Sequence, residues 1–214
     1  MRIISGRFRR RLLLTSPGQT TRPITDRVKE SLFERIEGSL KNARVADIFA
    51  GTGTIGLEAL SRGARSAVFI EQDRQAYELL LQNVATLEAT DETICWRTDA
   101  VRSSFRPHGG DDFRPYDVVF FDPPFPMIAG LRAGSPLYKA LQRLARPDVS
   151  AAKARLVLRV PEHSQFDIPG DWVLDWTLTL SNMDVHVYTK SPPDALETEP
   201  ADAPDPAAIA DDAS

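Results

Sequence analysis

Strand-like and helix-like stretches alternate along the middle of the chain. Five apolar stretches have the length and composition of buried strands, at residues 45–49, 67–71, 93–96, 116–121 and 155–160. Helices are expected between them, up to about Arg62, up to about Leu87 and over residues 137–144. This alternation predicts a parallel sheet with helices on both faces.

Two more strands, at residues 172–180 and 183–189, are separated only by Ser181 and Asn182, which predicts an antiparallel hairpin at the sheet edge. Ahead of the first strand, Thr25 can cap a helix whose apolar positions recur at helical spacing. These positions are Val28, Leu32, Phe33, Ile36 and Leu40. The predicted fold class is α/β: a doubly wound, Rossmann-like sheet of seven strands, the last one antiparallel, with a small N-terminal β-arm and a helix.

The two ends of the chain differ from the middle in composition. Residues 1–24 contain two short β-capable stretches around Gly6 and a group of arginines, so we interpret them as a basic N-terminal β-arm. Residues 25–190 are expected to form one domain, well within the length of a single core. Residues 191–214 hold seven acidic residues, no Lys or Arg and almost no large apolar side chain, which predicts a disordered acidic tail.

Composition also narrows the cellular setting. No apolar run approaches the roughly 18 residues needed to cross a bilayer, and the N-terminus lacks the apolar core of a secretory signal. Cys95 is the single cysteine, which excludes an intramolecular disulfide and is too few for a zinc site. We therefore expect a cytoplasmic, monomeric protein with no membrane contact and no metal.

The net charge of −4 conceals an uneven distribution. Without the acidic tail, residues 1–190 carry 26 basic and 23 acidic residues, a net charge of +3, and the first 36 residues carry nine and three. Either these cations form a solvated surface or they contact the phosphates of a nucleic acid. The candidate RNA-binding residues are Arg7, Arg9, Arg10, Arg11, Arg22 and Arg27.

A glycine-rich loop follows the first strand, with Gly51, Thr52, Gly53 and then Gly56 at the start of a helix. Small residues let backbone amides approach a ligand closely, but the same spacing also fits a dinucleotide site. Asp47, at the strand end, favours a different cofactor. A dinucleotide fold normally keeps an apolar residue there, whereas a carboxylate can meet the ammonium group of S-adenosylmethionine (SAM).

Two further acidic residues follow the next strands. Glu71 ends the second strand, about twenty residues after Gly51, where an acid accepts hydrogen bonds from both hydroxyls of a ribose. Asp99 follows the third strand, where it either accepts a hydrogen bond from the adenine amino group or closes a turn. Cys95 is a candidate nucleophile, but its place in the middle of a strand favours a buried thiol.

The strand that ends at Phe121 is followed directly by Asp122-Pro123-Pro124-Phe125. Consecutive prolines keep the backbone extended and remove two amide donors, so that carbonyl oxygens face the cleft. An exocyclic amine is a poor nucleophile because its lone pair is delocalised into the ring. Hydrogen bonds from its protons to the Asp122 carboxylate and the Pro123 carbonyl favour the pyramidal, nucleophilic form, and Phe125 can stack on the base.

With these residues assembled, the chain resembles the bacterial RsmD family, the methyltransferases of a guanine N2 in 16S ribosomal RNA. The resemblance is carried by Arg2-Ile3-Ile4-x-Gly6, by residues 22–33 (RPITDRVKESLF), by residues 47–63 and by residues 122–125. The block at 22–33 is the specific one, because the other chemistry-bearing motifs are shared with amino-methyltransferases acting on DNA, RNA or protein. A doubly wound sheet that ends in a hairpin also looks like the SAM-methyltransferase fold.

The resemblance implies SAM-dependent methylation of a guanine N2 during assembly of the small ribosomal subunit, with 16S rRNA or an assembly intermediate of that subunit as partner. It places Asp122 and Phe125 at the base, and Asp47, Gly51, Gly53 and Glu71 at the cofactor. Two features depart from the family pattern. Arg10 or Arg11 stands where members often have a glycine, and the acidic tail is not part of the family core.

Three alternatives stay open at this point. A nucleotide-dependent oxidoreductase would share the sheet and the glycine loop, but it leaves Asp47 and residues 122–125 unexplained. A non-catalytic RNA-binding assembly factor would keep the fold, although the intact Asp122 and Phe125 argue against it. The same amine chemistry on adenine N6 of DNA or RNA, or on glutamine in a protein, is the third; the basic arm counts against a protein substrate.

Overall fold

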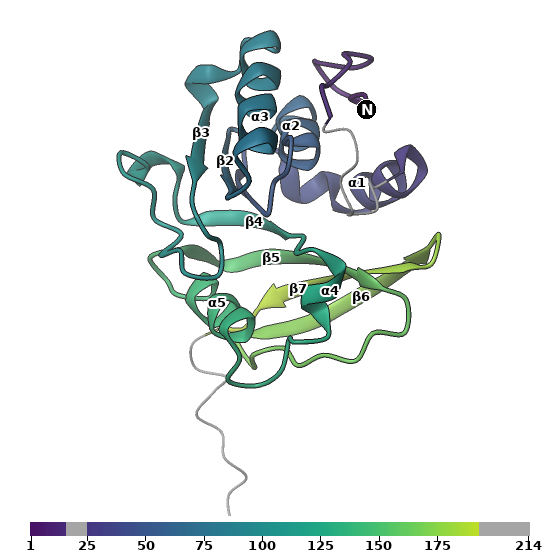
Figure 1. The fold of residues 1–214 in the computed structure, drawn as a ribbon, viewed down its shortest axis with the longest axis vertical. Coiled ribbons are helices and arrows are strands. Elements are labelled where there is room, and N and C mark those ends of the chain that lie inside the picture. The colour runs from purple at the N-terminus through teal and green to yellow at the C-terminus, as the bar shows by residue number, and fades with distance from the viewer. Residues whose placement is uncertain (16–24, 193–214) are drawn as a thin grey trace, which may run out of the picture.

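A computed structural model of the chain describes residues 1–15 and 25–192, and Figure 1 shows its fold. One sheet contains the strands β1 (Arg44–Ile48), β2 (Ser66–Glu71), β3 (Thr93–Arg97), β4 (Tyr116–Phe121), β5 (Ser150–Pro161), β6 (Trp172–Leu180) and β7 (Met183–Lys190). The helices are α1 (Asp26–Leu40), α2 (Thr54–Ser61), α3 (Arg74–Thr86), α4 (Phe125–Ile128) and α5 (Pro136–Leu144), with short 3-10 turns η1 (Thr90–Glu92) and η2 (Asp111–Phe113).

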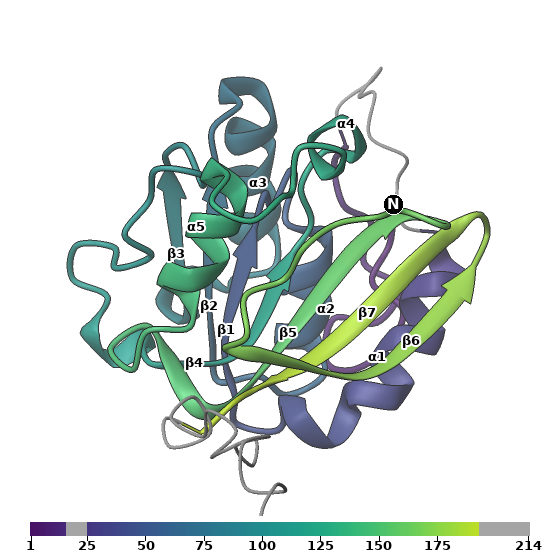
Figure 2. The same ribbon diagram turned by 90° about the horizontal axis from the view of Figure 1, so that it is seen from below.

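The strand order is β3-β2-β1-β4-β5-β7-β6. The strands β1 to β5 are parallel, and β7 runs antiparallel to both of its neighbours, β5 and β6. Helices α1, α2 and α3 pack on one face of the sheet, and α4 and α5 pack on the other (Figure 2). The predicted doubly wound sheet with an antiparallel last strand is therefore confirmed.

The hairpin at the sheet edge is also confirmed. Ser181 and Asn182 have φ angles of 55° and 62°, the left-handed values that a two-residue turn between twisted strands requires. Two elements differ from the sequence prediction. β5 begins at Ser150, before the apolar stretch that marked it, and α4 is a single turn that contains Pro126 and gives no periodic signal.

Helix α1 begins as the sequence predicts. The Thr25 side chain accepts a hydrogen bond from the Val28 amide at 3.3 Å. All five of the predicted apolar positions are buried: Val28, Leu32, Phe33, Ile36 and Leu40. The helix thus packs its apolar stripe against the sheet, with the Phe33 ring centroid 5.6 Å from that of Phe120 on β4.

The N-terminal segment is less strand-like than expected, because Arg2 and Leu12 form only an isolated antiparallel bridge. The amides of Ile3 and Leu13 donate to the carbonyls of Arg11 and Met1, and other amides of the segment bind side chains of α2. Those of Ile4 and Ser5 donate to the Glu58 carboxylate at 2.8 and 3.1 Å. Arg10, near the expected glycine position, has a φ of 69°, the left-handed value that glycine adopts most easily.

Glu58 is the centre of a fully buried ionic cluster. Lys29 on α1 lies 3.1 Å from its carboxylate, with both side chains completely buried, and Arg62 lies 2.8 Å away. Lys29 also donates to the carbonyl of Arg2 at 2.6 Å. Gly6 completes the junction, since a Cβ there would lie 1.7 Å from the carbonyl oxygen of Ser61. One carboxylate therefore joins the N-terminal segment, α1 and α2.

Parts of the sequence prediction fall outside the described residues, namely Arg22 and most of the acidic tail, residues 193–214. The division into residues 1–24, 25–190 and 191–214 accordingly stays a prediction. In the part of the chain that is described, no helix has the length and apolar character needed to cross a membrane.

We predict that Glu58→Ala lowers the free energy of unfolding by about 3–5 kcal/mol, because it leaves the Lys29 ammonium buried without its carboxylate. Urea unfolding followed by circular dichroism measures the loss. Glu78→Ala breaks the exposed Arg74–Glu78 pair on α3 and serves as the control, with no measurable change expected. Equal losses in the two variants would contradict the role of the Glu58 cluster.

Candidate active site

The strand order reverses direction between β1 and β4. From β1 the chain moves outward to β2 and β3, and then returns to place β4 on the other side of β1. Loops leaving the carboxyl ends of such neighbouring strands diverge and open a crevice, the usual ligand site of doubly wound sheets. Ile48 and Phe121 end these strands in register, and the Asp122 amide donates to the Ile48 carbonyl at 3.2 Å. Asp47 and Asp122 therefore lie at the same edge of the sheet, close enough for their charges to interact.

The glycine loop is shaped by packing as well as by backbone conformation. Gly51 and Gly53 have φ angles of 55° and 80°, and Gly53 caps α2. A Cβ on Gly53 would lie 2.4 Å from a Leu80 methyl group, and one on Gly56 would lie 2.3 Å from the Phe69 ring. These glycines let α2 approach β2 and α3, a reason for them that is independent of any ligand.

Thr52 is buried between the two glycines of the loop. Its carbonyl accepts a hydrogen bond from the Asn83 side chain of α3 at 2.9 Å. Asn83 also bonds both backbone groups of Leu14, so α3 holds the loop and the N-terminal segment together. The loop conformation is thus fixed by α3 before any ligand arrives.

Asp47 is almost completely buried, with 1% of its surface exposed. One carboxylate oxygen accepts a hydrogen bond from the Gly56 amide at 2.8 Å. Burial nevertheless raises the pKa of Asp47 to about 8, the nearby charges of Asp122 and Glu71 add to the rise, and the Gly56 hydrogen bond opposes it. A cation that reached this carboxyl group would stabilise its ionised form.

Glu71 ties the end of β2 to the glycine loop. One of its carboxylate oxygens accepts a hydrogen bond from the Gly51 amide and the other from the Asp73 amide, both at 2.7 Å. Each carboxylate oxygen has a second lone pair, so Glu71 can still accept hydrogen bonds from two hydroxyl groups. It lies beside the loop on the strand next to that of Asp47, where a cofactor-binding acid was expected.

The two remaining candidate residues, Asp99 and Cys95, occupy structural positions in and just after β3. Asp99 accepts a hydrogen bond from the Val101 amide at 2.9 Å and lies 3.8 Å from the Arg102 guanidinium, so it closes a turn after β3. Cys95 is partly buried within β3, and burial raises the pKa of its thiol to about 12. The thiol is therefore protonated at neutral pH and is not a thiolate nucleophile.

A side chain that the sequence analysis did not single out completes the site. Arg159 on β5 forms a two-pronged ion pair with Asp122, with nitrogen–oxygen distances of 2.8 and 2.7 Å. Its guanidinium carbon also lies 5.4 Å from the centroid of the Phe125 ring. Pro123, which lies between Asp122 and Phe125 in the sequence, is buried. The sequence signal that could have identified Arg159 is that it is the charged residue in the otherwise apolar stretch of residues 156–160.

The arginine-rich segment lies away from this crevice. The Arg7 amide donates to Ser61, the last residue of α2, and the Arg7 side chain pairs with Glu92, just before β3 begins. Arg11 donates to the carbonyl of Thr86, the last residue of α3. Helices that follow parallel strands end at the edge where those strands begin. These arginines therefore lie at the amino edge of the sheet, opposite Asp122.

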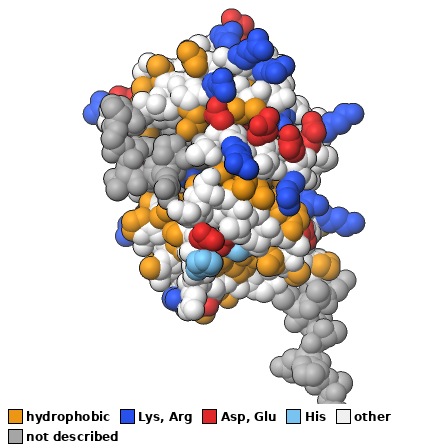
Figure 3. Space-filling model, turned by 90° about the vertical axis from the view of Figure 1, so that its right-hand side faces the viewer, with side chains coloured by type: hydrophobic (Ala, Val, Ile, Leu, Met, Phe, Trp, Pro, Cys, Tyr) orange, Lys and Arg blue, Asp and Glu red, His pale blue; other side chains and the backbone are white. Residues whose placement is uncertain are grey.

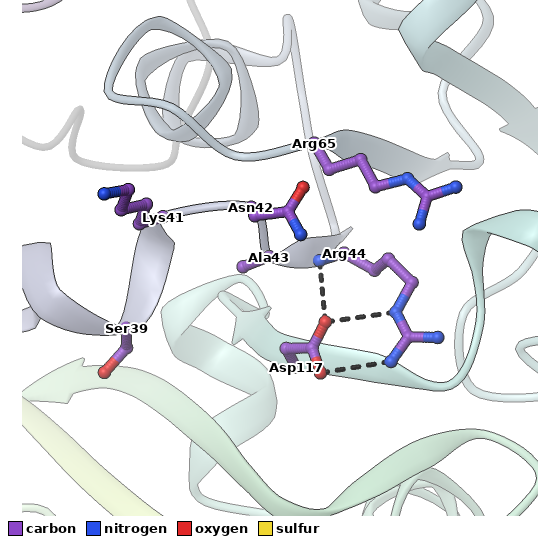
Figure 4. Close-up of a pocket in the computed structure, with 7 residues that line it drawn as sticks. All are labelled: Ser39, Lys41, Asn42, Ala43, Arg44, Arg65 and Asp117. Carbon is purple, nitrogen blue, oxygen red and sulfur yellow. Dashed lines mark hydrogen bonds and ion pairs between the residues drawn. The ribbon is translucent and has the colours of Figure 1, made fainter.

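The other described candidates for RNA contact are exposed: Arg9, Arg10 and Arg27. A hollow at the amino edge adds Lys41 and Arg65 to the basic groups there, while Arg44 is paired with Asp117 (Figure 4). On the side shown in Figure 3, basic side chains lie mainly at the top and the right-hand margin, with acidic and hydrophobic ones between them. Positive charge is therefore distributed in separate groups.

In the described ranges, 1–15 and 25–192, no three or more His, Cys, Asp or Glu side chains are grouped to hold a metal ion. Asp122 is paired with the Arg159 guanidinium, whereas Asp47 and Glu71 accept hydrogen bonds from backbone amides. The site is therefore suited to binding an organic cation and a polar acceptor group.

We predict that Asp47→Asn stabilises the protein at pH 8 but not near pH 4. The wild-type carboxyl group keeps its proton up to about pH 8 when folded but only to about 3.8 when unfolded, so wild-type stability falls as the pH rises through this window. The loss is at most about 1.4 kcal/mol per pH unit. Urea unfolding between pH 4.5 and 8.5 tests it. Exposed Asp91→Asn is the control, and a difference between Asp47→Asn and wild type that does not vary with pH would refute the prediction.

The chain is similar to several known proteins. The family model Cons_hypoth95, described as "Conserved hypothetical protein 95", matches residues 1–169. The Bacillus subtilis protein named "Putative rRNA methyltransferase YlbH" is 34% identical over 190 residues, which cover 89% of this chain and 99% of the relative. The Escherichia coli "Ribosomal RNA small subunit methyltransferase D" is 41% identical over 125 residues, 58% of this chain and 60% of the relative.

A solved structure is similar over nearly its whole length. The protein described as "Putative methyltransferase yhhF from Escherichia coli" superposes with a TM-score of 0.73 and 33% identity, covering 89% of this chain and 98% of that chain. The range that the family model matches spans the glycine loop, the Asp122–Phe125 loop and Arg159. The chain belongs to the Cons_hypoth95 family, which is the RsmD family that its sequence motifs resemble.

Proposed function

We propose that this protein transfers a methyl group from SAM to the exocyclic N2 amine of a guanine in 16S ribosomal RNA. The observation that carries the proposal is the meeting of Asp47 and Asp122 at the point where the strand order reverses, with Glu71 and the glycine loop beside them. A dinucleotide-dependent oxidoreductase would leave Asp122 and Phe125 without a role. Membership of the RsmD family supports the same assignment.

The residues on the cofactor side fit SAM. The buried Asp47 carboxyl group gains a stabilising partner when an ammonium group arrives, and Glu71 can accept hydrogen bonds from ribose hydroxyls. The loop from Gly51 to Gly53 holds its conformation through α3 and β2 and does not need to reorganise. Bound SAM supplies the electrophilic methyl group, and these residues orient it toward Asp122.

The residues on the acceptor side fit an aromatic amine. The Asp122 carboxylate is a hydrogen-bond acceptor for an amine proton, and it is most stabilising as positive charge develops on nitrogen. Phe125, four residues after the end of β4 at Phe121, offers an aromatic surface for the base. The narrow, largely buried setting of Asp122, 13% exposed, strengthens these electrostatic contacts by limiting water.

The RNA partner follows from the relatives and from the distribution of charge. One relative is named for ribosomal RNA of the small subunit, which supports 16S rRNA or an assembly intermediate of that subunit as the substrate. Such a substrate would be met in the cytoplasm, by a monomer of this chain. With basic groups at the amino edge and the base site at the carboxyl edge, the RNA would have to contact both.

Mapping of modified nucleotides tests the proposal directly. Ribosomal RNA from cells with and without the gene should differ by one N2-methylguanosine in 16S rRNA, restored by the wild-type gene. Loss of N6-methyladenosine instead would support the adenine alternative. Unchanged rRNA modification would overturn the proposed substrate.

We predict that Asp122→Ala lowers the rate of methyl transfer by about 100-fold or more while SAM affinity stays within a few-fold, because the carboxylate addresses the acceptor amine. Transfer from labelled SAM and calorimetric titration of SAM measure the two quantities. Loss of SAM binding together with activity would show that Asp122 serves the cofactor instead.

We also predict that the double variant Arg9→Ala, Arg10→Gly weakens RNA binding and leaves SAM affinity unchanged. Glycine is used at Arg10 because of its positive φ. Each lost phosphate contact should reduce the slope of log affinity against log salt by about 0.7 for single-stranded RNA. Lys139→Ala, an exposed change on α5, is the control. Parallel salt plots for the double variant and the wild type would exclude these two arginines from the RNA interface.

A further inference from the structure

Arg159 contacts both side chains that the loop after β4 presents to the crevice. Its Nε donates to one Asp122 oxygen at 2.8 Å and its Nη2 to the other at 2.7 Å. The same guanidinium lies 5.4 Å from the centre of the Phe125 ring. One buried cation therefore links the proposed amine-binding carboxylate to the proposed base-stacking ring.

The pairing is geometrically specific. A guanidinium fork that bonds both oxygens fixes the plane of a carboxylate, which a single point charge does not. The two side chains are 13% and 9% exposed, so water competes little for these bonds. A bidentate pair uses two of the roughly four lone-pair positions of the carboxylate, which leaves acceptor positions on Asp122 for an amine.

The positive charge of Arg159 also offsets negative charge from nearby carboxylates. Asp47, Glu71 and Asp122 are close enough for the charges of Asp122 and Glu71 to raise the pKa of Asp47. A cation on β5, the neighbour of β4 on the side away from β1, offsets this crowding of negative charge at the sheet edge. Lysine could supply the charge, but only arginine supplies the fork.

We propose that Arg159 is a positioning residue that orients the Asp122 carboxylate and the Phe125 ring for the acceptor base. This inference rests on the proposed methyl-transfer function and assigns to Arg159 no contact with SAM. A displacement of about 1 Å in a reacting group costs on the order of 100-fold in rate, so loss of the fork should be visible in turnover.

The first test compares two substitutions with a matched control. Arg159→Ala should lower kcat by about 100-fold and Arg159→Lys by about 10-fold or more, each with SAM affinity within about threefold of wild type. Arg155 lies four residues earlier on the same face of β5 and pairs with Asp175, so Arg155→Ala should leave kcat unchanged. If Arg159→Ala fails to fold, Arg159→Lys decides. A folded Arg159→Lys with wild-type kcat, or a parallel loss of SAM affinity, would overturn the proposal.

A double-mutant cycle tests whether Arg159 acts through Asp122. If it does, adding Arg159→Ala to Asp122→Ala should reduce the remaining rate by less than about threefold. A further loss as large as that of Arg159→Ala alone would mean that the two residues act independently, against the proposal.

A spectroscopic test does not depend on knowing the RNA substrate. The carboxyl carbon resonance of Asp122, assigned by its absence in Asp122→Ala, should shift in Arg159→Lys and stay in place in Arg155→Ala. A resonance unmoved by Arg159→Lys would refute the positioning role. A shift in Arg159→Lys, together with wild-type protein that methylates no RNA, would leave this pairing standing and would instead refute the proposed function.

Discussion

Several carboxylates lie at the point where the strand order reverses between β1 and β4. This concentration of negative charge is the constraint on which the site depends. Parallel strands bring their carboxyl ends to one edge, and here that edge receives Asp47, Glu71 and Asp122. Such groups are costly to bury unless they are protonated, hydrogen-bonded or paired. The protein uses all three means: burial raises the pKa of Asp47, backbone amides bind Glu71, and Arg159 pairs with Asp122.

This distribution suits a site that receives one cation and one amine. The structure provides no cation for Asp47 among the described residues that contact it, so a bound cation would stabilise its charged form, whereas Asp122 already has its counter-ion and is held in one orientation. In the proposed function, the same electrostatic arrangement separates the cofactor side from the acceptor side.

A second buried charge, Glu58, holds the elements around the sheet. It joins three of the four sequence blocks that carry the family resemblance, through Lys29, Arg62 and the amides of Ile4 and Ser5. The specific block at residues 22–33 therefore has a structural role that can be stated: Lys29 brings α1 to α2. Because buried ion pairs tolerate little change in geometry, these blocks depend on one another.

The sequence by itself determined the succession of strands and helices, the hairpin at the edge and the presence of Asp47, Glu71 and Asp122 at one edge of the sheet. Apolar periodicity, turn residues and strand-end acids are local signals, and parallel strand ends necessarily share an edge. Only the tertiary structure decided what depends on distant contacts. Arg159 reaches Asp122 across 37 residues, the Glu58 cluster joins residues 29 and 58, and the arginines of the N-terminal segment lie at the opposite edge from the crevice. No local pattern encodes these distances, because they arise from how the strands and helices pack.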